Sequence, residues 1–294
     1  MPAQPSTKGS LRTFLEMIKF EHSVFALPYA MLGMMWAAVP SGWPGFRTFF
    51  LILLAMVSCR TAAMAYNRIA DRDIDAVNDR TKMRAIPAGL LSLRQVNIYF
   101  FASCLLFVMA ASLLNLLTLV LSPVALFVTI FYSRTKRFTW LCHYWLGLSL
   151  GIAPTAAWIA VTGQFAVRPL LLTLAVMFWT AGFDIIYALQ DEEFDRDHGL
   201  HSVPAKFGKE RALLISRFTH LVSFGFLVAS FIGATHSIFG YAALVFAGVM
   251  LAYEQSLVKP HDLRKVNMAF FTLNGCISVG VFLIALVDKI AFGQ

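Results

Sequence analysis

Two stretches of the chain carry carboxylates at a helical spacing. Asn67, Asp71 and Asp75 are separated by four residues each, so on a helix they would form a stripe along one face. Asp191 and Asp195 repeat this interval 120 positions after Asp71 and Asp75. Carboxylate and amide oxygens are hard ligands that suit Mg²⁺, which often bridges carboxylates to phosphate oxygens. The pattern therefore predicts a site for a magnesium-bound diphosphate.

The same carboxylates have a structural explanation. Solvated helix ends often carry acidic residues that form ion pairs with a basic residue one turn away, and arginines are close by in both stretches. A single acidic pair would favour that explanation. Here two pairs match after a shift of 120 residues, which indicates a degenerate internal repeat with two halves. This favours a metal site, because binding sites in membrane proteins commonly lie between the two halves of such a repeat.

Basic residues elsewhere could complete a phosphate site. Tyr132, Lys136 and Arg137 fall at the end of an apolar stretch, and Arg68 directly follows Asn67. Lysine and arginine form charge-assisted hydrogen bonds with phosphate oxygens and can stabilise a leaving diphosphate. Basic residues at the end of a membrane span are also an ordinary topology signal.

Arg60 lies within an apolar stretch, seven residues and about two helical turns before Asn67. An ionisable residue at such a depth is a functional candidate, because the membrane interior disfavours charge. Arg60 could bind an anionic substrate or pair with Asp184.

The histidines fall into two groups. His198 and His201 lie in the second acidic stretch, where either could act as a general base or be merely solvated. His143, His220 and His236 are expected to be ordinary interfacial residues.

The composition shows what kind of elements must position these side chains. Of 294 residues, 59% are hydrophobic and only 14% are charged, with a mean hydropathy of +0.70. An average soluble domain has about 25% charged residues. The chain is therefore expected to be an all-α integral membrane protein, with one domain over residues 1–294.

Uncharged runs predict nine membrane helices, since about 20 residues cross the hydrocarbon core. The helices should surround a central cavity that is capped by the two Asp-rich loops, at about 67–94 and 190–212. The expected spans are 22–46, 48–66, two within 95–133 that divide near residue 115, 138–167, 170–189, two within 218–253, and 266–287.

The loop charges predict the orientation. On this division, 20 of the 24 Lys and Arg residues fall on one side, which the positive-inside rule assigns to the cytosol. The N-terminal segment 1–20 would then be cytosolic, and the protein would lie in the plasma (inner) membrane. The net charge of +8 is explained by topology and requires no nucleic acid. The four cysteines are isolated, which does not favour metal or redox work.

The order of these motifs resembles the UbiA superfamily of intramembrane aromatic prenyltransferases. The runs "NRIADRDIDAVNDRT" and "DIIYALQDEEFD" carry most of the resemblance. The family's motifs are matched by Asn67, Asp71 and Asp75, by Tyr132 and Lys136, and by Asp184, Tyr187, Asp191 and Asp195. The first span, with "EHSVFALPYA", is most similar to the 4-hydroxybenzoate polyprenyltransferase branch.

The resemblance implies a reaction as well as a fold. Two Mg²⁺ ions near the Asn67 and Asp191 motifs would hold the diphosphate of a polyprenyl donor. Arg68, Lys136 and Arg137 would add positive charge as the C–O bond breaks. A small aromatic acid, most simply 4-hydroxybenzoate, would attack the allylic cation in a step of quinone biosynthesis, and aromatic residues such as Tyr187 and Tyr132 could shield the cation.

Other interpretations remain open at this stage. The acceptor could be a dihydroxynaphthoate of a menaquinone pathway, and its carboxylate could bind Arg60, Arg137, Lys19 or His22. A cation-coupled transporter could also show an internal repeat and an intramembrane arginine, although its charges are expected near the midplane. The sequence does not indicate the prenyl chain length or the oligomeric state.

Overall fold

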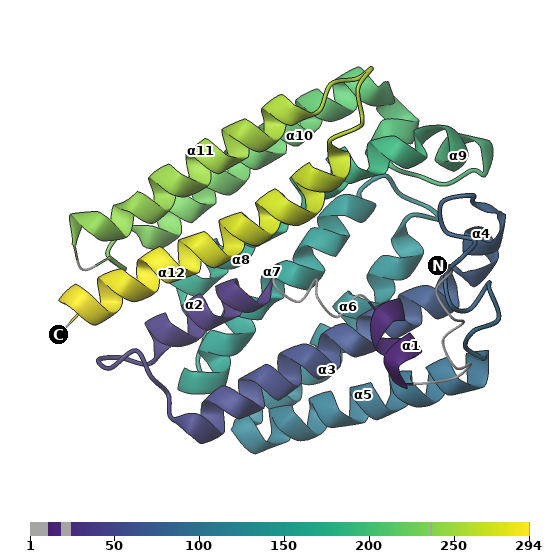
Figure 1. The fold of residues 1–294 in the computed structure, drawn as a ribbon. Coiled ribbons are helices and arrows are strands. Elements are labelled where there is room, and N and C mark those ends of the chain that lie inside the picture. The colour runs from purple at the N-terminus through teal and green to yellow at the C-terminus, as the bar shows by residue number, and fades with distance from the viewer. Residues whose placement is uncertain (1–10, 19–24, 236, 294) are drawn as a thin grey trace, which may run out of the picture.

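The computed structural model describes residues 11–18, 25–235 and 237–293, and this part of the chain is helical without a β-strand (Figure 1). Eight of its helices are long and apolar enough to cross a membrane. They contain α3 (Phe46–Ala70), α5 (Leu93–Leu114), α6 (Leu116–Thr135), α7 (Cys142–Thr162), α8 (Val167–Ala188), α10 (Val203–Phe231), α11 (Ala242–Leu257) and α12 (Asn274–Phe292). The helical course of α8 continues to Asp197, and the short helical segments Ile238–Tyr241 and Met268–Leu273 extend α11 and α12 at their starts. The shorter helices are α1 (Leu11–Met17), α2 (Leu27–Ala37), α4 (Arg72–Val77) and α9 (Glu192–Asp197).

The first predicted span is the one that differs most. Its place is taken by α2, which has 11 residues and a length of about 16 Å, so α2 by itself is too short to cross the membrane. Nearly all of α2 is buried, and at Gly33 it approaches α7 so closely that a Cβ atom would lie 2.4 Å from the Pro154 carbonyl oxygen. Residues 19–24 lie outside the described residues, so a count of nine spans stays a prediction.

Helix boundaries elsewhere follow local signals. The predicted division near residue 115 is confirmed, because the Asn115 side chain accepts a hydrogen bond from the Thr118 N–H and so caps α6. The start of α10 was predicted 15 residues too late. Ser202 caps that helix at Val203, and its first turns are polar enough to escape a search for apolar runs.

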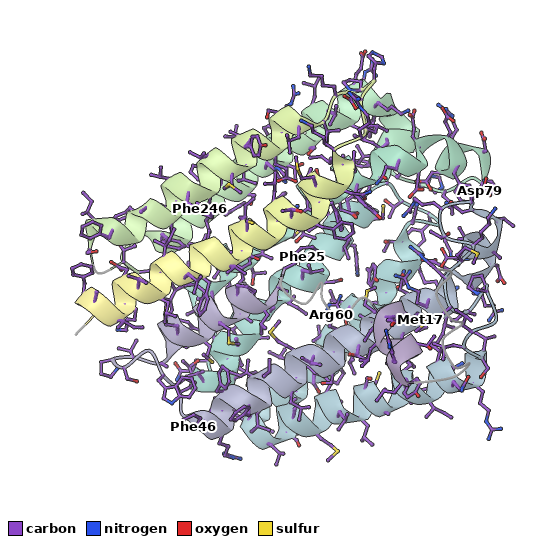
Figure 2. All side chains as sticks on the ribbon, viewed as in Figure 1. Met17, Phe25, Phe46, Arg60, Asp79 and Phe246 are labelled. Atoms are coloured by element: carbon purple, nitrogen blue, oxygen red, sulfur yellow. The ribbon has the colours of Figure 1, made fainter. Side chains whose placement is uncertain are left out.

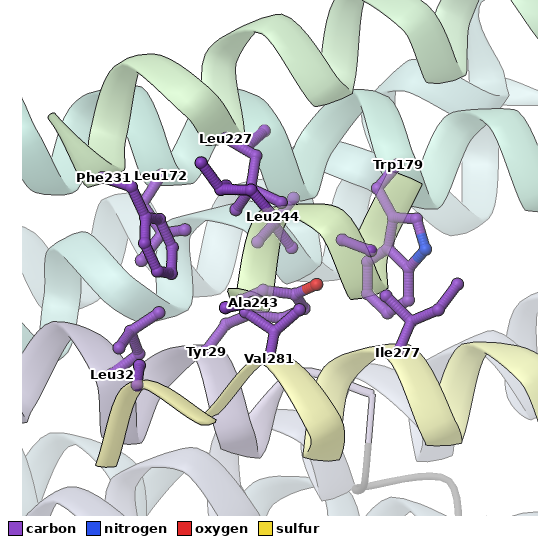
Figure 3. Close-up of a cluster of buried hydrophobic side chains, with 14 of the residues drawn as sticks. Tyr29, Leu32, Leu172, Trp179, Leu227, Phe231, Ala243, Leu244, Ile277 and Val281 are labelled. Atoms are coloured by element: carbon purple, nitrogen blue, oxygen red, sulfur yellow. The ribbon is translucent and has the colours of Figure 1, made fainter. Parts of the chain in front are cut away.

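The apolar core fills one half of the bundle. Side chains from five helices meet there, as Figure 3 shows. They include Tyr29 and Leu32 from α2, Leu172 and Trp179 from α8, Leu227 and Phe231 from α10, Ala243 and Leu244 from α11, and Ile277 and Val281 from α12. This core holds α8 in place. Helix α8 leads directly into the segment that holds Asp191 and Asp195, here called the second acidic segment.

Glycines bring α7 and α8 into close contact. A Cβ atom at Gly147 would lie 2.1 Å from the carbonyl oxygen of Met177. We therefore expect Gly147→Ala to force the two helices apart and to lower the free energy of unfolding by about 1–3 kcal/mol. Thermal unfolding in detergent would measure the loss. Gly225→Ala is the matched control, because a Cβ there meets no atom within 4 Å; equal melting of the two variants would contradict the expectation.

The first acidic segment, which holds Asn67, Asp71 and Asp75, lies at the same end of the bundle as the second. Figure 1 shows α4 and α9 beside each other at one end, together with α1, while the end of α12 at Phe292 lies at the opposite end. We call the end that holds α4 and α9 the acidic end.

Candidate active site

A large cavity in the described residues starts at the acidic end and runs into the bundle. Its volume is about 1050 Å³, and mainly apolar side chains of α3, α6, α7 and α8 form its wall. On α3 the lining extends from Arg68 to Ile52, a rise of about 24 Å along the helix. Phe25 and Arg60, both labelled in Figure 2, also line this cavity.

The first acidic segment continues α3 with little interruption. The Asp71 N–H donates to the Asn67 carbonyl oxygen at 2.9 Å, and the Asp75 N–H donates to the Asp71 carbonyl oxygen at 2.7 Å. These bonds keep the helical course through the junction of α3 and α4, so the three side chains stand on successive turns as their spacing predicted. The Asn67 Nδ2 atom also donates to Asp71 Oδ2 at 2.8 Å.

Two arginines that follow the first acidic segment neutralise one carboxylate in each segment. Arg84 lies 2.7 Å from Asp75 Oδ1 and 2.9 Å from Oδ2. Arg80 donates from Nε to Asp191 Oδ1 at 2.9 Å and from Nη2 to Asp191 Oδ2 at 2.5 Å. The bidentate Arg80 contact therefore joins the two acidic segments, which are far apart in the sequence.

The basic pair after α6 neutralises the other two carboxylates. Lys136 Nζ lies 2.6 Å from Asp195 Oδ1, and Arg137 Nη2 lies 3.7 Å from Asp71 Oδ1. Arg137 also donates to the Ala70 carbonyl oxygen. Each predicted metal-binding aspartate is thus paired with a positive side chain.

Burial and charge act together on the ionisable groups here. Burial raises the pKa of the Asp71 carboxyl, the neighbouring Asp75 raises it further, and Arg137 opposes both effects. Burial also lowers the pKa of the Lys136 ammonium, but Asp195 outweighs burial and leaves that pKa raised. The Asp71 carboxylate therefore depends on nearby positive charge, chiefly that of Arg137, to stay ionised.

The residues of the two acidic segments fit a divalent cation. Asp195 is fully buried, and its Oδ2 atom accepts no hydrogen bond from the described residues, an arrangement that costs free energy unless a cation satisfies it. No group of three or more His, Cys, Asp or Glu side chains in the described ranges is placed to hold a metal. Mg²⁺ can bind with fewer protein ligands, because it retains waters and takes phosphate oxygens from a substrate.

Arg60 and Arg68 are both held by the end of α1. Arg60 Nη1 donates to the Ile18 carbonyl oxygen at 3.3 Å, and Arg68 Nε donates to the Met17 carbonyl oxygen at 3.4 Å. Arg68 Nη1 also donates to Asn67 Oδ1 at 3.1 Å. Both arginines line the cavity, whereas the alternative candidates Lys19 and His22 lie outside the described residues.

Aromatic side chains surround the cavity just below the carboxylates. The Tyr187 hydroxyl accepts a hydrogen bond from Arg80 Nη1 at 3.1 Å, and its ring centroid lies 4.1 Å from that of Phe270. Phe183 packs against Phe270 at 5.2 Å. Tyr132 lines the cavity from α6. Rings from three helical elements therefore face the space where a bound apolar chain would begin.

Asp184 pairs with His143 and not with Arg60. His143 Nδ1 lies 2.7 Å from Asp184 Oδ2, and the imidazole is buried. The expectation that His143 is interfacial was wrong, as it was for the buried His220; His236 lies outside the described residues. The contact joins the start of α7 to α8.

Sequence reasoning also missed Arg80 and Arg84. Their spacing of four residues repeats that of the aspartates, which would have suggested a second polar face. His143 gave no comparable signal, because its proximity to Asp184 arises only when α7 packs on α8.

Membrane-length helices around an apolar cavity, with paired carboxylates and basic side chains at one end, define an integral multi-pass membrane enzyme for an apolar substrate with an anionic head. The amino-acid sequence identifies the family. The sequence model of the UbiA prenyltransferase family matches residues 26–275. The chain therefore belongs to the UbiA prenyltransferase family, which confirms the resemblance drawn from the motifs and favours a transferase over a transporter.

Relatives match along nearly the whole chain. The 4-hydroxybenzoate octaprenyltransferase of Shewanella piezotolerans is 28% identical over 271 residues, which are 90% of this chain and 94% of that protein. The protein of the same name from Methylobacillus flagellatus is 27% identical over 286 residues, 94% of this chain and 95% of that protein.

Solved structures show the same fold. An apo UbiA homolog from Aeropyrum pernix K1 has a TM-score of 0.79 and 30% identity, covering 92% of this chain and 98% of its own. A UbiA homolog from Archaeoglobus fulgidus, bound to DMAPP and Mg²⁺, has a TM-score of 0.73 and 21% identity, covering 95% of this chain and 100% of its own.

Proposed function

We propose that this enzyme transfers a polyprenyl group from polyprenyl diphosphate to 4-hydroxybenzoate in a Mg²⁺-dependent step of quinone biosynthesis. The observation that carries the proposal is one continuous cavity that joins charge-paired carboxylates and arginines to a long apolar interior. A polyprenyl diphosphate has the same division between an anionic head and an apolar tail. The relatives named 4-hydroxybenzoate octaprenyltransferase support this donor and this acceptor.

The basic side chains at the acidic end would bind the diphosphate. Arg68, Arg80 and Arg84 line the cavity, and Lys136 and Arg137 lie beside the aspartates. Their charge-assisted hydrogen bonds would orient the diphosphate and stabilise it as the C–O bond breaks. Mg²⁺ bound in two sites would neutralise the leaving group further. The residues that would hold the two ions are Asn67, Asp71, Asp75, Asp191 and Asp195.

The aromatic side chains would protect the allylic carbon. Tyr187, Phe183 and Phe270 line the cavity immediately below the diphosphate site. Their ring faces attract a cation, and their bulk keeps out water that would otherwise capture it. The prenyl chain would extend along α3 and α7 into the apolar part of the cavity.

Arg60 would bind the carboxylate of the acceptor. It lines the same cavity and lies seven residues before Asn67, about 10 Å deeper along α3. An aromatic acid bound there would lie below the diphosphate, on the side from which the allylic carbon can be attacked. Arg137, the other described candidate, lies at the acidic end, where it contacts Ala70 and Asp71.

We expect Arg60→Ala to raise the KM for 4-hydroxybenzoate at least about 10-fold, because a charge-assisted hydrogen bond contributes about 1.5–3 kcal/mol. The KM for the donor should change much less. Steady-state kinetics with each substrate varied in turn would separate the two effects. The control is 4-hydroxybenzamide, which lacks the carboxylate and should lose little on the substitution; an unchanged KM for 4-hydroxybenzoate would remove Arg60 from this role.

The orientation in the membrane is part of the proposal. The asymmetry of loop charges supports a cytosolic acidic end and N-terminus in the plasma (inner) membrane. A diphosphate donor and a water-soluble aromatic acid would then both reach the site from the cytosol.

The reaction can be tested directly with purified protein in a bilayer. Octaprenyl diphosphate is supplied with either 4-hydroxybenzoate or a dihydroxynaphthoate, each with Mg²⁺ and with EDTA, and the lipid extract is analysed by mass spectrometry. We expect prenylated 4-hydroxybenzoate only with Mg²⁺. Product from the dihydroxynaphthoate alone would assign the enzyme to the menaquinone alternative, and an intact donor in every reaction would contradict prenyl transfer to both acceptors.

A further inference from the structure

The Asp184 carboxylate lines the cavity between the depth of Arg60 and the acidic end. It lies seven residues before Asp191, and Arg60 lies eleven residues before Asp71, so Asp184 is about 10 Å and Arg60 about 16 Å deeper than the first aspartate of its own segment. Arg60 is on α3 and Asp184 is on α8. An acceptor with its carboxylate at Arg60 would therefore have Asp184 on another wall of the cavity.

The hydrogen bonds of His143 fix its protonation. The Val203 backbone N–H donates to His143 Nε2 at 3.1 Å, so that ring nitrogen carries no hydrogen. The hydrogen of the neutral imidazole must then be on Nδ1, where it is donated to Asp184 Oδ2 at 2.7 Å. His143 is therefore a neutral donor that orients an ionised carboxylate.

The Asp184 side chain retains one free oxygen. Oδ2 is occupied by His143, whereas Oδ1 accepts no hydrogen bond from any residue in the described part of the chain. The side chain is 21% exposed, compared with 3% for His143, and that exposure is toward the cavity. The free oxygen is thus accessible to a bound ligand.

Another buried histidine of the bundle, His220, lacks a carboxylate partner among the described residues. His220 spends both ring nitrogens on protein partners, the Trp179 carbonyl oxygen and the Gln255 amide, and it does not line the cavity. The His143 pair also uses both ring nitrogens, but it leaves a carboxylate oxygen directed at the substrate space. This difference points to a role in the reaction.

We propose that Asp184 takes the proton released from the aromatic ring, and that His143 is its positioning residue; this inference rests on the proposed function. The allylic C–O bond breaks and its electron pair leaves with the diphosphate. A π pair of the ring then forms the new C–C bond at the carbon ortho to the hydroxyl. The C–H bond of that carbon returns its pair to the ring, and the proton moves to Asp184 Oδ1, giving a neutral carboxylic acid.

The choice of residue agrees with the charges that develop. The ring is cationic after C–C bond formation, and an ionised carboxylate stabilises such a cation at short range. A carboxylate whose second oxygen is already hydrogen-bonded is fixed in direction and needs no reorganisation when the proton moves. His198 and His201, the sequence candidates for the base, are exposed and do not line the cavity.

The decisive test is a deuterium isotope effect on ring substitution. Wild-type enzyme and Asp184→Asn are compared with 4-hydroxybenzoate and its ring-deuterated form. We expect Asp184→Asn to lower kcat about 100-fold, to leave the KM for the donor nearly unchanged, and to introduce a primary isotope effect that is larger than in the wild type, because loss of the ring proton becomes rate-limiting. Asp184→Glu, which retains a carboxylate, should show a smaller isotope effect than Asp184→Asn.

The positioning role of His143 is tested by the same measurement. His143→Asn keeps an N–H that can reach Asp184 and should retain more of kcat than His143→Leu, which keeps none; only His143→Leu should introduce an isotope effect. His220→Asn controls for the loss of a buried histidine and should show no isotope effect.

Four results would count against the proposal. An Asp184→Asn enzyme with normal kcat, or with reduced kcat and the wild-type isotope effect, would overturn Asp184 as the base. Equal isotope effects in Asp184→Glu and Asp184→Asn would overturn it even if the asparagine variant folds poorly. A wild-type enzyme that prenylates neither acceptor would overturn the proposed function itself.

Discussion

Replacement of either Asp71 or Asp191 by asparagine is expected to lower kcat about 1000-fold or more while the protein stays folded. Asparagine has nearly the same shape as aspartate, but it removes the negative charge that a divalent cation requires. The remaining amide is a weak ligand, so the leaving diphosphate loses much of its stabilisation. Turnover at increasing Mg²⁺ concentration would be measured, and excess Mg²⁺ should restore only a small part of the activity.

The acidic segments themselves offer matched controls. Asp73 and Asp79 lie in or next to the first segment, but their side chains are 83% and 95% exposed and they pair only with local residues. Figure 2 shows Asp79 at the periphery of the acidic end. Asp73→Asn and Asp79→Asn should therefore retain normal turnover. If Asp71→Asn behaved as these controls do, the magnesium site would have to lie elsewhere.

A bulky side chain in the apolar part of the cavity is expected to select against long donors. Ala55 lines the cavity on α3, 12 residues before Asn67 and so about 18 Å deeper. In Ala55→Trp, a long prenyl tail would lose roughly 150 Å² of apolar contact, or about 4 kcal/mol, which is close to 1000-fold in kcat/KM for octaprenyl diphosphate. Geranyl diphosphate is short enough to bind above the new ring, so its kcat/KM should change little.

The adjacent residue provides the control for this substitution. Leu54 is 41% exposed on the outer face of α3 and does not line the cavity. Leu54→Trp adds a comparable ring toward the surroundings and should leave both donors unaffected. Equal loss with the two donors in Ala55→Trp would show that the ring distorts the site and does not block the tail.

Much of this arrangement could be predicted from the sequence, because its signals are local. Asn67, Asp71 and Asp75 stay on one face across the junction of α3 and α4, because residues four apart on a helix point in nearly the same direction. The division at Asn115 was equally local. For α2, the length of the apolar run was an unreliable guide to a membrane span, because burial between other helices produces the same composition as contact with lipid.

The contacts that complete the site were beyond local signals. Arg80 meets Asp191 only after the chain between α4 and α5 folds back over α8, and His143 meets Asp184 only through the packing of two helices. A single sequence records which residues are charged, but the choice of partner is made by tertiary structure. The motifs therefore predicted the carboxylates and left their basic partners unassigned.

Four basic side chains pair with Asp71, Asp75, Asp191 and Asp195. Metal and diphosphate should therefore bind to the site in combinations that keep its net charge small. Divalent cations arriving alone would leave an excess of positive charge in a poorly solvated place, and diphosphate arriving alone would leave an excess of negative charge. Each ion therefore lowers the cost of the other. Metal and donor are expected to bind with positive thermodynamic coupling, so that the empty enzyme holds metal weakly and chelators act fastest between turnovers.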